Sequence, residues 1–265
     1  MRLGLGLSWG LQGNPSADAP PPPPPPPPGP FSPGDLFASG ETGGWYDIQN
    51  LSAMTVGRDG TGGAPGVGGV VGRLIDQSGN GNDVVAYSDA ARPLLQETAD
   101  GHRYLSFDGI DDHMRLDLAA PPQMSVMFAA SGRQAGNNGR FLSISSEQDH
   151  DWGTEGHLLI YRKNGNVLAE KTLETIHNFG AYDSMRLYEV TADGTNVTVG
   201  NNEGSSSVAY ALNNAQFVFG ARSKLPLQGF IDMDFFGCVL INRLLTVDER
   251  ADLRQHYADL SGVSL

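Results

Sequence analysis

Residues 229–250 read GFIDMDFFGCVLINRLLTVDER, and this stretch decides the fold class. Its first half, residues 231–241, is a mostly apolar run that is typical of a buried β-strand. In its second half, Thr246 is followed three residues later by Glu249. This is the spacing of a capping box, in which a hydroxyl and a carboxylate each accept a hydrogen bond from a free backbone N–H at the start of a helix. A strand followed by a helix is therefore predicted.

The predicted helix has one apolar face. Leu253, Tyr257 and Leu260 recur at helical spacing, and Gly262 is placed to end the helix in a left-handed turn. We expect this single amphipathic segment, about a turn and a half of helix, to lie against the sheet and close it.

Upstream, short apolar segments alternate with turn chemistry. Asn164-Gly165 separates two apolar segments and is the strongest hairpin signal in the chain, and Asp193-Gly194 separates two more in the same way. Residues 108–112 form a turn-rich stretch between two further strand-like segments. Many short strands joined by such turns predict an antiparallel sandwich or barrel.

Three motifs in this order resemble laminin-G-like, concanavalin A-like domains. They are DQSGNGN at residues 76–82, FDGIDD at residues 107–112, and the closing Asn-Arg-x-Leu-Thr pattern at residues 242–246. The resemblance implies an all-β fold: an antiparallel β-sandwich of the jelly-roll, concanavalin A-like type with one C-terminal α-helix. We expect this domain to span residues 31–265, preceded by an extended N-terminal anchor.

The N-terminus has two predicted parts. In residues 1–19, Leu3, Leu5, Leu7 and Trp9 alternate with other residues, which is strand spacing. An isolated strand cannot stay folded, so we interpret this segment as an anchor peptide that is ordered on a larger assembly. A flexible tail or a cleaved secretory signal are the alternatives. Residues 20–30 include nine consecutive prolines, which predict a polyproline II rod of roughly 28 Å, or alternatively a ligand for an SH3-like groove.

A narrower resemblance concerns the start of the body. LFASGE at residues 36–41 and GWYD at residues 44–47, after a Leu-Gly-rich start and a low-complexity spacer, resemble appended virion proteins of tailed bacteriophages and gene transfer agents. This resemblance implies a fibre, spike or decoration on the virion surface that contacts other virion proteins through its N-terminal peptide and host polysaccharide through its sandwich. It also makes a homotrimer possible. A purely architectural role, or a secreted glycan-binding or glycan-cleaving module, are the alternatives.

Composition excludes several classes. The 265 residues carry a net charge of −13, which argues against nucleic-acid binding through a basic face. No apolar stretch is long enough to span a membrane. Cys238 is the single cysteine, which excludes an intrachain disulfide framework.

Concanavalin A-like folds include glycosidases, so the resemblance makes catalysis an alternative. Retaining glycosidases need two carboxyl groups about 5–5.5 Å apart, and the nearest candidates here are Asp232 and Asp234 on one strand face. Phe230 occupies the position where a first carboxylate is needed. We therefore predict a protein without enzymatic activity.

Glycan binding calls for an aromatic ring beside hydrogen-bonding side chains, because a sugar has an apolar face and a polar rim. Asp149, Asp151 and Trp152 form the best such group, in a polar, loop-like stretch. Tyr182, in the stretch 178–183, is a second candidate. For each ring, the alternative is a loop aromatic packed over the rim of the sandwich.

No cofactor is predicted, although calcium is possible in two oxygen-rich loops. One contains Asp108, Asp111 and Asp112, and the other contains Asp76, Asn80, Asn82 and Asp83. Calcium prefers such oxygen ligands, but Asp and Asn equally accept local backbone hydrogen bonds in turns. No metal ligand is assigned.

Overall fold

Two antiparallel sheets face each other across an apolar core in this computed structural model. The structure describes residues 30–119, 121–133, 138–145, 158–171, 174–201, 203–212, 216–222 and 229–265. Phe31–Leu265 forms one compact unit. The predicted anchor, residues 1–19 with Leu3, Leu5, Leu7 and Trp9, and the proline run lie outside the described residues, so both stay predictions.

The first sheet, sheet A, has eight strands in the described part of the chain, in the order β15-β14-β13-β8-β17-β6-β5, with β1 also paired to β17. Their bounds are β1 Gly43–Asp47, β5 Leu94–Glu97, β6 Arg103–Asp108, β8 Gln123–Gly132, β13 Arg186–Asp193, β14 Asn196–Asn201, β15 Gly204–Ala209 and β17 Asp232–Ile241. The predicted C-terminal strand is β17. It lies inside the sheet, between β8 on one side and β6 and β1 on the other.

The second sheet, sheet B, has nine described strands in the order β12-β11-β10-β9-β16-β7-β4-β3-β2. Their bounds are β2 Met54–Thr55, β3 Arg73–Leu74, β4 Val84–Ala86, β7 Met114–Leu116, β9 Arg140–Ser145, β10 Leu158–Lys163, β11 Asn166–Lys171, β12 Glu174–Ala181 and β16 Gln216–Phe219. The β10–β11 hairpin turns at Asn164 and Gly165, which have φ angles of 51° and 82°. Two positive φ values are what a tight hairpin turn of this kind requires, so the hairpin prediction is confirmed.

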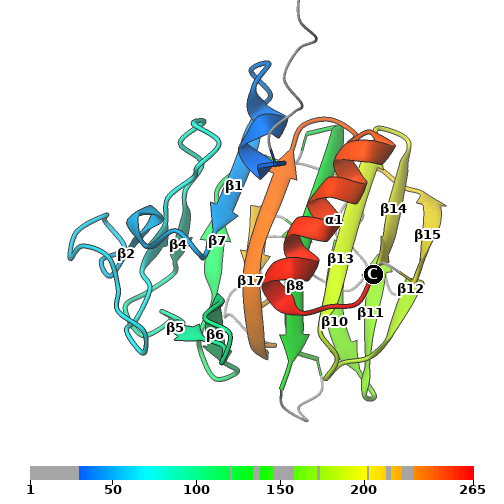
Figure 1. Cartoon of the computed structure of the whole chain (residues 1–265). Helices are drawn as coiled ribbons and strands as arrows, with labels where there is room; N and C mark the ends of the chain where they lie inside the picture. Colours follow the sequence, from blue (N-terminus) through cyan, green and yellow to red (C-terminus); the bar gives the residue numbers. More distant parts are fainter. Residues whose placement is uncertain are drawn as a thin grey trace, which may run out of the picture. The chain divides into compact units, whose positions relative to one another are not determined.

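The helix α1, Val247–Ser261, lies across sheet A and contacts β8, β13 and β17 (Figure 1). Its capping box at Thr246 and Glu249 and its left-handed end at Gly262, with a φ of 73°, are as predicted. The helix has 15 residues, so the predicted length of a turn and a half is wrong. The apolar spacing of Leu253, Tyr257 and Leu260 marks only the second part of the helix, which begins directly after its N-cap at Thr246.

Two apolar clusters hold these layers together. The larger one lies between the sheets and includes Phe107, Phe128 and Phe235. The smaller one lies between sheet A and α1 and includes Leu253 and Tyr257, together with residues of the 3₁₀ helix η1, Pro33–Phe37. A second 3₁₀ helix, η2, spans Leu51–Ala53. Within the described residues, no helix is both long and apolar enough to cross a bilayer. The predicted β-sandwich with one C-terminal helix is thus confirmed.

Candidate functional site

The sequence-predicted glycan residues are only partly described. Asp149, Asp151 and Trp152 lie outside the described residues. Tyr182 follows β12 and is half-buried beside the core, with the guanidinium carbon of Arg162 3.7 Å from its ring centroid. Phe179, three residues earlier, is fully buried. The ring of Tyr182 is therefore covered on one face by an arginine, at the β12 edge of sheet B.

The carboxylates weighed for catalysis share one arginine. Arg133 Nε donates to Asp232 Oδ1 at 2.6 Å, and Arg133 Nη1 lies 3.1 Å from Asp234 Oδ1. Burial, opposed by Arg133 and assisted by the charge of Asp232, raises the pKa of Asp234 to about 6. The pair is held as the two acidic members of an ion-pair cluster. This arrangement differs from two carboxyl groups facing each other across a bound sugar.

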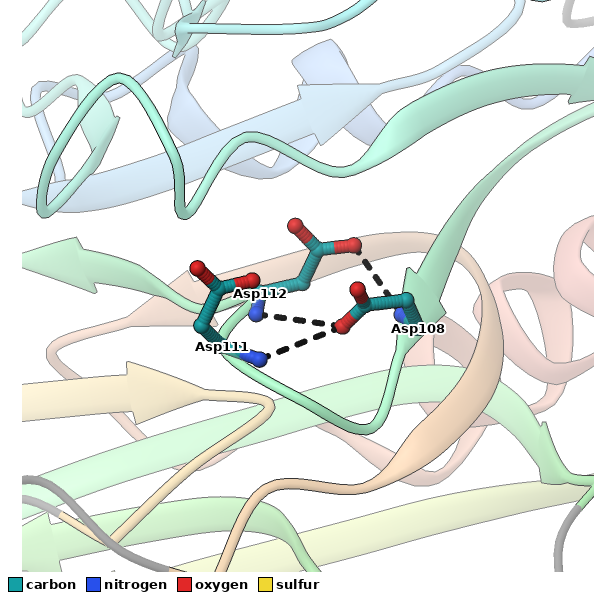
Figure 2. A group of neighbouring side chains, drawn as sticks. All are labelled: Asp108, Asp111 and Asp112. Carbon is teal, nitrogen blue, oxygen red and sulfur yellow. Dashed lines mark hydrogen bonds between the residues drawn. The ribbon is translucent and has the colours of Figure 1, made fainter.

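The turn between β6 and β7 brings three carboxylates together, as Figure 2 shows. One oxygen of each of Asp108, Asp111 and Asp112 lies within 4.8 Å of the others. Asp108 Oδ1 accepts hydrogen bonds from the backbone N–H groups of Ile110, Asp111 and Asp112 at 2.8, 3.2 and 3.4 Å. Asp112 Oδ2 accepts one from the N–H of Asp108 at 2.9 Å. These hydrogen bonds close the turn, and they account for the close approach of the three carboxylates without a bound metal ion.

Burial and the neighbouring carboxylates change the titration of Asp112, the buried member of this turn. Burial, and then the charge of Asp108, raises the pKa of Asp112 to about 7. Calcium takes carboxylate oxygens, and these three residues offer them. At neutral pH, however, Asp112 is partly protonated, and Oδ1 of Asp108 already accepts backbone hydrogen bonds. Both features weaken the turn as a calcium site.

The second oxygen-rich loop is also used structurally. The carboxylate of Asp76 accepts hydrogen bonds from the backbone N–H groups of Trp45, Ser78 and Asn82 at 3.0, 2.8 and 3.1 Å. Ser78 Oγ adds a fourth bond at 2.8 Å. This buried aspartate ties β1 to the loop before β4. The backbone N–H of Asp76 also donates to Asp83 Oδ1 at 2.8 Å, so Asp76 holds both Asn82 and Asp83 in place.

A cavity of about 420 Å³ opens on sheet B near its β2 edge. We call it the Tyr87 groove; its lining residues are Arg58, Arg73, Gly81, Asn82, Asp83, Val85, Ala86, Tyr87, Arg115, Leu116 and Asp117. Arg73, Val85 and Arg115 are direct partners across β3, β4 and β7. Their strand neighbours Leu74, Val84, Ala86, Met114 and Leu116 belong to the core between the sheets. Since alternate residues point to opposite faces, the groove lies on the outer face of sheet B.

Two arginines of the groove are paired within it. Arg73 Nε donates to Asp83 Oδ2 at 2.6 Å, and its Nη2 lies 2.5 Å from the same oxygen. Arg115 Nη2 donates to Asp117 Oδ2 at 3.0 Å, while its Nε lies 2.9 Å from Asp117 Oδ1. These ion pairs fix the side chains around the floor of the groove, which Val85 forms.

Tyr87 supplies the aromatic surface of the groove and is 40% exposed. Its ring centroid lies 5.2 Å from that of His113, a buried residue whose Nδ1 contacts the backbone oxygen of Asp111 at 2.8 Å. Burial lowers the pKa of His113, so its imidazole is neutral at pH 7. The guanidinium carbon of Arg115 lies 5.9 Å from the centroid of the Tyr87 ring. The acidic turn thus holds His113, and His113 supports Tyr87.

Sequence reasoning missed this groove because its residues come from separate segments. Arg58, Arg73, Tyr87 and Arg115 share no motif. Strand register aligns Arg73 and Arg115, and Arg58 joins them through its hydrogen bond to the Ala86 carbonyl, next to Tyr87. One local signal was present: in residues 114–117, Met-Arg-Leu-Asp, charged and apolar side chains alternate, which marks a strand with one polar outer face. By contrast, Tyr182 lies beside β12, at the opposite edge of sheet B from β2.

Comparison with known proteins identifies the fold class. No protein-family model matches the chain, and a search of curated proteins finds no relative. Among solved structures, domain 4 of an extracellular GH43 arabinanase from Geobacillus stearothermophilus, in complex with arabinotriose, is similar with a TM-score of 0.55 and 13% identity. The match covers 80% of this chain and 97% of that domain.

Two further structures are similar over part of their length. A GH54 α-L-arabinofuranosidase soaked with a cyclic sulfate inhibitor has a TM-score of 0.60 at 12% identity, covering 87% of this chain and 66% of that one. The ligand-binding domain of botulinum neurotoxin serotype D, in complex with N-acetylneuraminic acid, has a TM-score of 0.52 at 12% identity, covering 86% and 53%.

These similarities establish a fold class, the jelly-roll β-sandwich. At such low identity they show the fold alone. They agree with the concanavalin A-like part of the resemblance drawn from the sequence, whereas its phage part stays a prediction.

Proposed function

We propose that this protein binds glycan through the Tyr87 groove. The observation that carries the proposal is the partly exposed Tyr87 ring in a cavity of about 420 Å³ whose polar lining consists of charged and amide side chains. A sugar presents an apolar ring face and a polar rim, and a concave site with an aromatic surface and a few fixed polar groups suits both. The ion pairs of Arg73 and Arg115 hold those groups in place before a ligand arrives.

We also propose that the protein binds glycan without cleaving it. The ion pairs between Arg133 and both Asp232 and Asp234 support this, because a glycosidase acid must be free to protonate the leaving oxygen. Incubation with arabinan, xylan and sialylated glycans should release no sugar. Turnover of any of them that disappears in Asp234→Asn would show that the protein is an enzyme.

The finer proposal is that the sandwich is the head of a fibre, spike or decoration on a phage-like particle and contacts host-surface polysaccharide. It rests on the resemblance of residues 36–47 to appended virion proteins and on the order of anchor-like peptide, proline run and sandwich in the sequence. A purely architectural decoration and a secreted glycan-binding module remain its alternatives. Identification of the protein that cross-links to residues 1–13 tests it, and a partner that is no particle protein would contradict it.

The glycan proposal is tested with a glycan array and two tyrosine variants. Tyr87→Ala should lose at least tenfold in affinity for the best array glycan, because the stacking surface of the groove is gone. Tyr182→Ala is the matched control, since its ring is covered by Arg162 at the other edge of sheet B. Loss of binding in Tyr182→Ala with Tyr87→Ala unchanged would move the site to the sequence-predicted stretch. If no glycan on the array binds, the glycan proposal is wrong and the purely architectural role takes its place.

A further inference from the structure

The Tyr87 groove has more arginines than carboxylates among its lining residues. Arg58, Arg73 and Arg115 face two aspartates, Asp83 and Asp117. This excess of one positive charge lies on a chain whose net charge is −13. At physiological ionic strength, screening limits the field of the distant acidic surface to about 8 Å. The local charges of the groove therefore decide which ligand it attracts.

The three arginines differ in how their guanidinium groups are used. Arg73 and Arg115 each place Nε and Nη2 against an aspartate of the groove. Arg58 donates Nε to the backbone oxygen of Ala86 at 2.6 Å. Within the described part of the chain, no carboxylate forms an ion pair with Arg58, so its charge has no counter-charge among these residues.

The hydrogen bond to Ala86 also orients Arg58. Because Nε is held by a β4 carbonyl at the edge of the groove, the two terminal nitrogens Nη1 and Nη2 are the donors left for a ligand. Two parallel N–H donors match the two oxygens of a carboxylate or of a sulfate ester, and such charge-assisted forks are stronger than neutral hydrogen bonds. Tyr87 lines the same cavity and offers the surface for the sugar ring.

We infer that the ligand of the Tyr87 groove is an acidic saccharide, whose carboxylate or sulfate group pairs with Nη1 and Nη2 of Arg58 while a sugar ring lies against Tyr87. This inference rests on the proposed glycan-binding function and adds the chemical class of the ligand. Arg58 is the specificity residue, and Arg73 and Arg115 are positioned by their aspartates.

The experiment compares matched glycan pairs that differ only in the acidic group. Sialyllactose is measured against lactose, a galacturonate oligomer against its methyl ester, and a sulfated oligosaccharide against the unsulfated one, by an array and then by calorimetry. Wild type should prefer at least one acidic member about tenfold or more over its neutral partner. The pair that shows the preference distinguishes a carboxylate from a sulfate.

Arg58→Gln should reduce the affinity for the acidic member to that of the neutral partner, and Arg58→Lys, which keeps the charge but not the fork, should retain part of it. Arg250→Gln, on α1 against sheet A, is the matched control and should leave the affinity for both glycans unchanged. Thermal melting of each variant establishes that it is folded.

Binding of neutral glycans that depends on Tyr87 but shows no acidic preference would overturn the inference and leave the proposed function standing. An equal loss for acidic and neutral partners in Arg58→Gln would also overturn it. Failure of every glycan to bind would overturn both.

Discussion

At the scale of single residues, Gly220, directly after β16 of sheet B, packs tightly against Phe107 of β6 in sheet A. Its φ is +89°, and a Cβ atom there would lie 2.6 Å from Cδ1 of Phe107 and 2.9 Å from the backbone oxygen of Asp112. Gly220→Ala should therefore lower the free energy of unfolding by about 2–4 kcal/mol, through backbone strain and overpacking. Gly204→Ala, where nothing lies within 4 Å, is the control. Urea unfolding measures both, and equal effects would contradict the prediction.

Asp234 provides a pH-dependent prediction at the same scale. Its pKa in the folded protein is raised from 3.8 to about 6, so the folded state binds the proton more tightly than the unfolded state. The stabilisation from protonation is then complete below about pH 4 and is lost as the pH rises to about 6. The Asp234→Asn variant has no carboxyl group to titrate at this position. The free energy of unfolding of the variant minus that of wild type should therefore rise by about 1–2 kcal/mol between pH 4 and pH 6 and stay constant above that range.

Denaturation of wild type and Asp234→Asn between pH 4 and pH 8 tests this prediction. Asp252→Asn, which removes an exposed carboxylate on α1, is the control. A stability difference between wild type and Asp234→Asn that does not change with pH would contradict the prediction.

At the scale of elements, the start of α1 depends on its capping box and on one arginine. The Oγ1 of Thr246 accepts from the N–H of Glu249 at 3.2 Å, and Arg243 holds the Glu249 carboxylate with two hydrogen bonds of 2.7 Å. Because the helix buries Leu253 and Tyr257 on sheet A, Thr246→Ala should cost about 1 kcal/mol. Val247→Ala, at a position 82% exposed, should cost less than about 0.5 kcal/mol. Chemical denaturation that ranks them the other way would contradict this account.

At the scale of the whole molecule, Phe31–Leu265 forms one compact unit that holds the described members of both apolar clusters. We therefore expect residues 31–265 to melt within about 2 °C of the full chain and to bind the glycan that we propose as the ligand of the full chain. Differential scanning calorimetry and the glycan assay measure the two parts. A large drop in melting temperature would mean that the N-terminal segment belongs to the folded body.

The sequence by itself determined the fold class, because the signals for turns and helix ends depend only on residues that are neighbours in the chain. The Asn164-Gly165 turn, the capping box at Thr246 and the stop at Gly262 each depend on local backbone geometry, and each is present in the structure. The strand β8 carried no such signal. It is buried along almost its whole length between α1 and the core, so its sequence lacks the alternation that marks a half-exposed strand.

Only the tertiary structure decided where a ligand site can form. Arg58, Tyr87 and Arg115 are separated by about thirty residues each along the chain. The register of β3, β4 and β7 places Arg115 beside Val85 and Arg73, Tyr87 follows β4 directly, and a hydrogen bond to the Ala86 carbonyl holds Arg58 at the same cavity. Likewise, only the fold placed Arg133 between Asp232 and Asp234. Such sites depend on non-local pairing, and a change of register by a single residue would turn strand side chains such as Arg73 and Arg115 to the other face of the sheet.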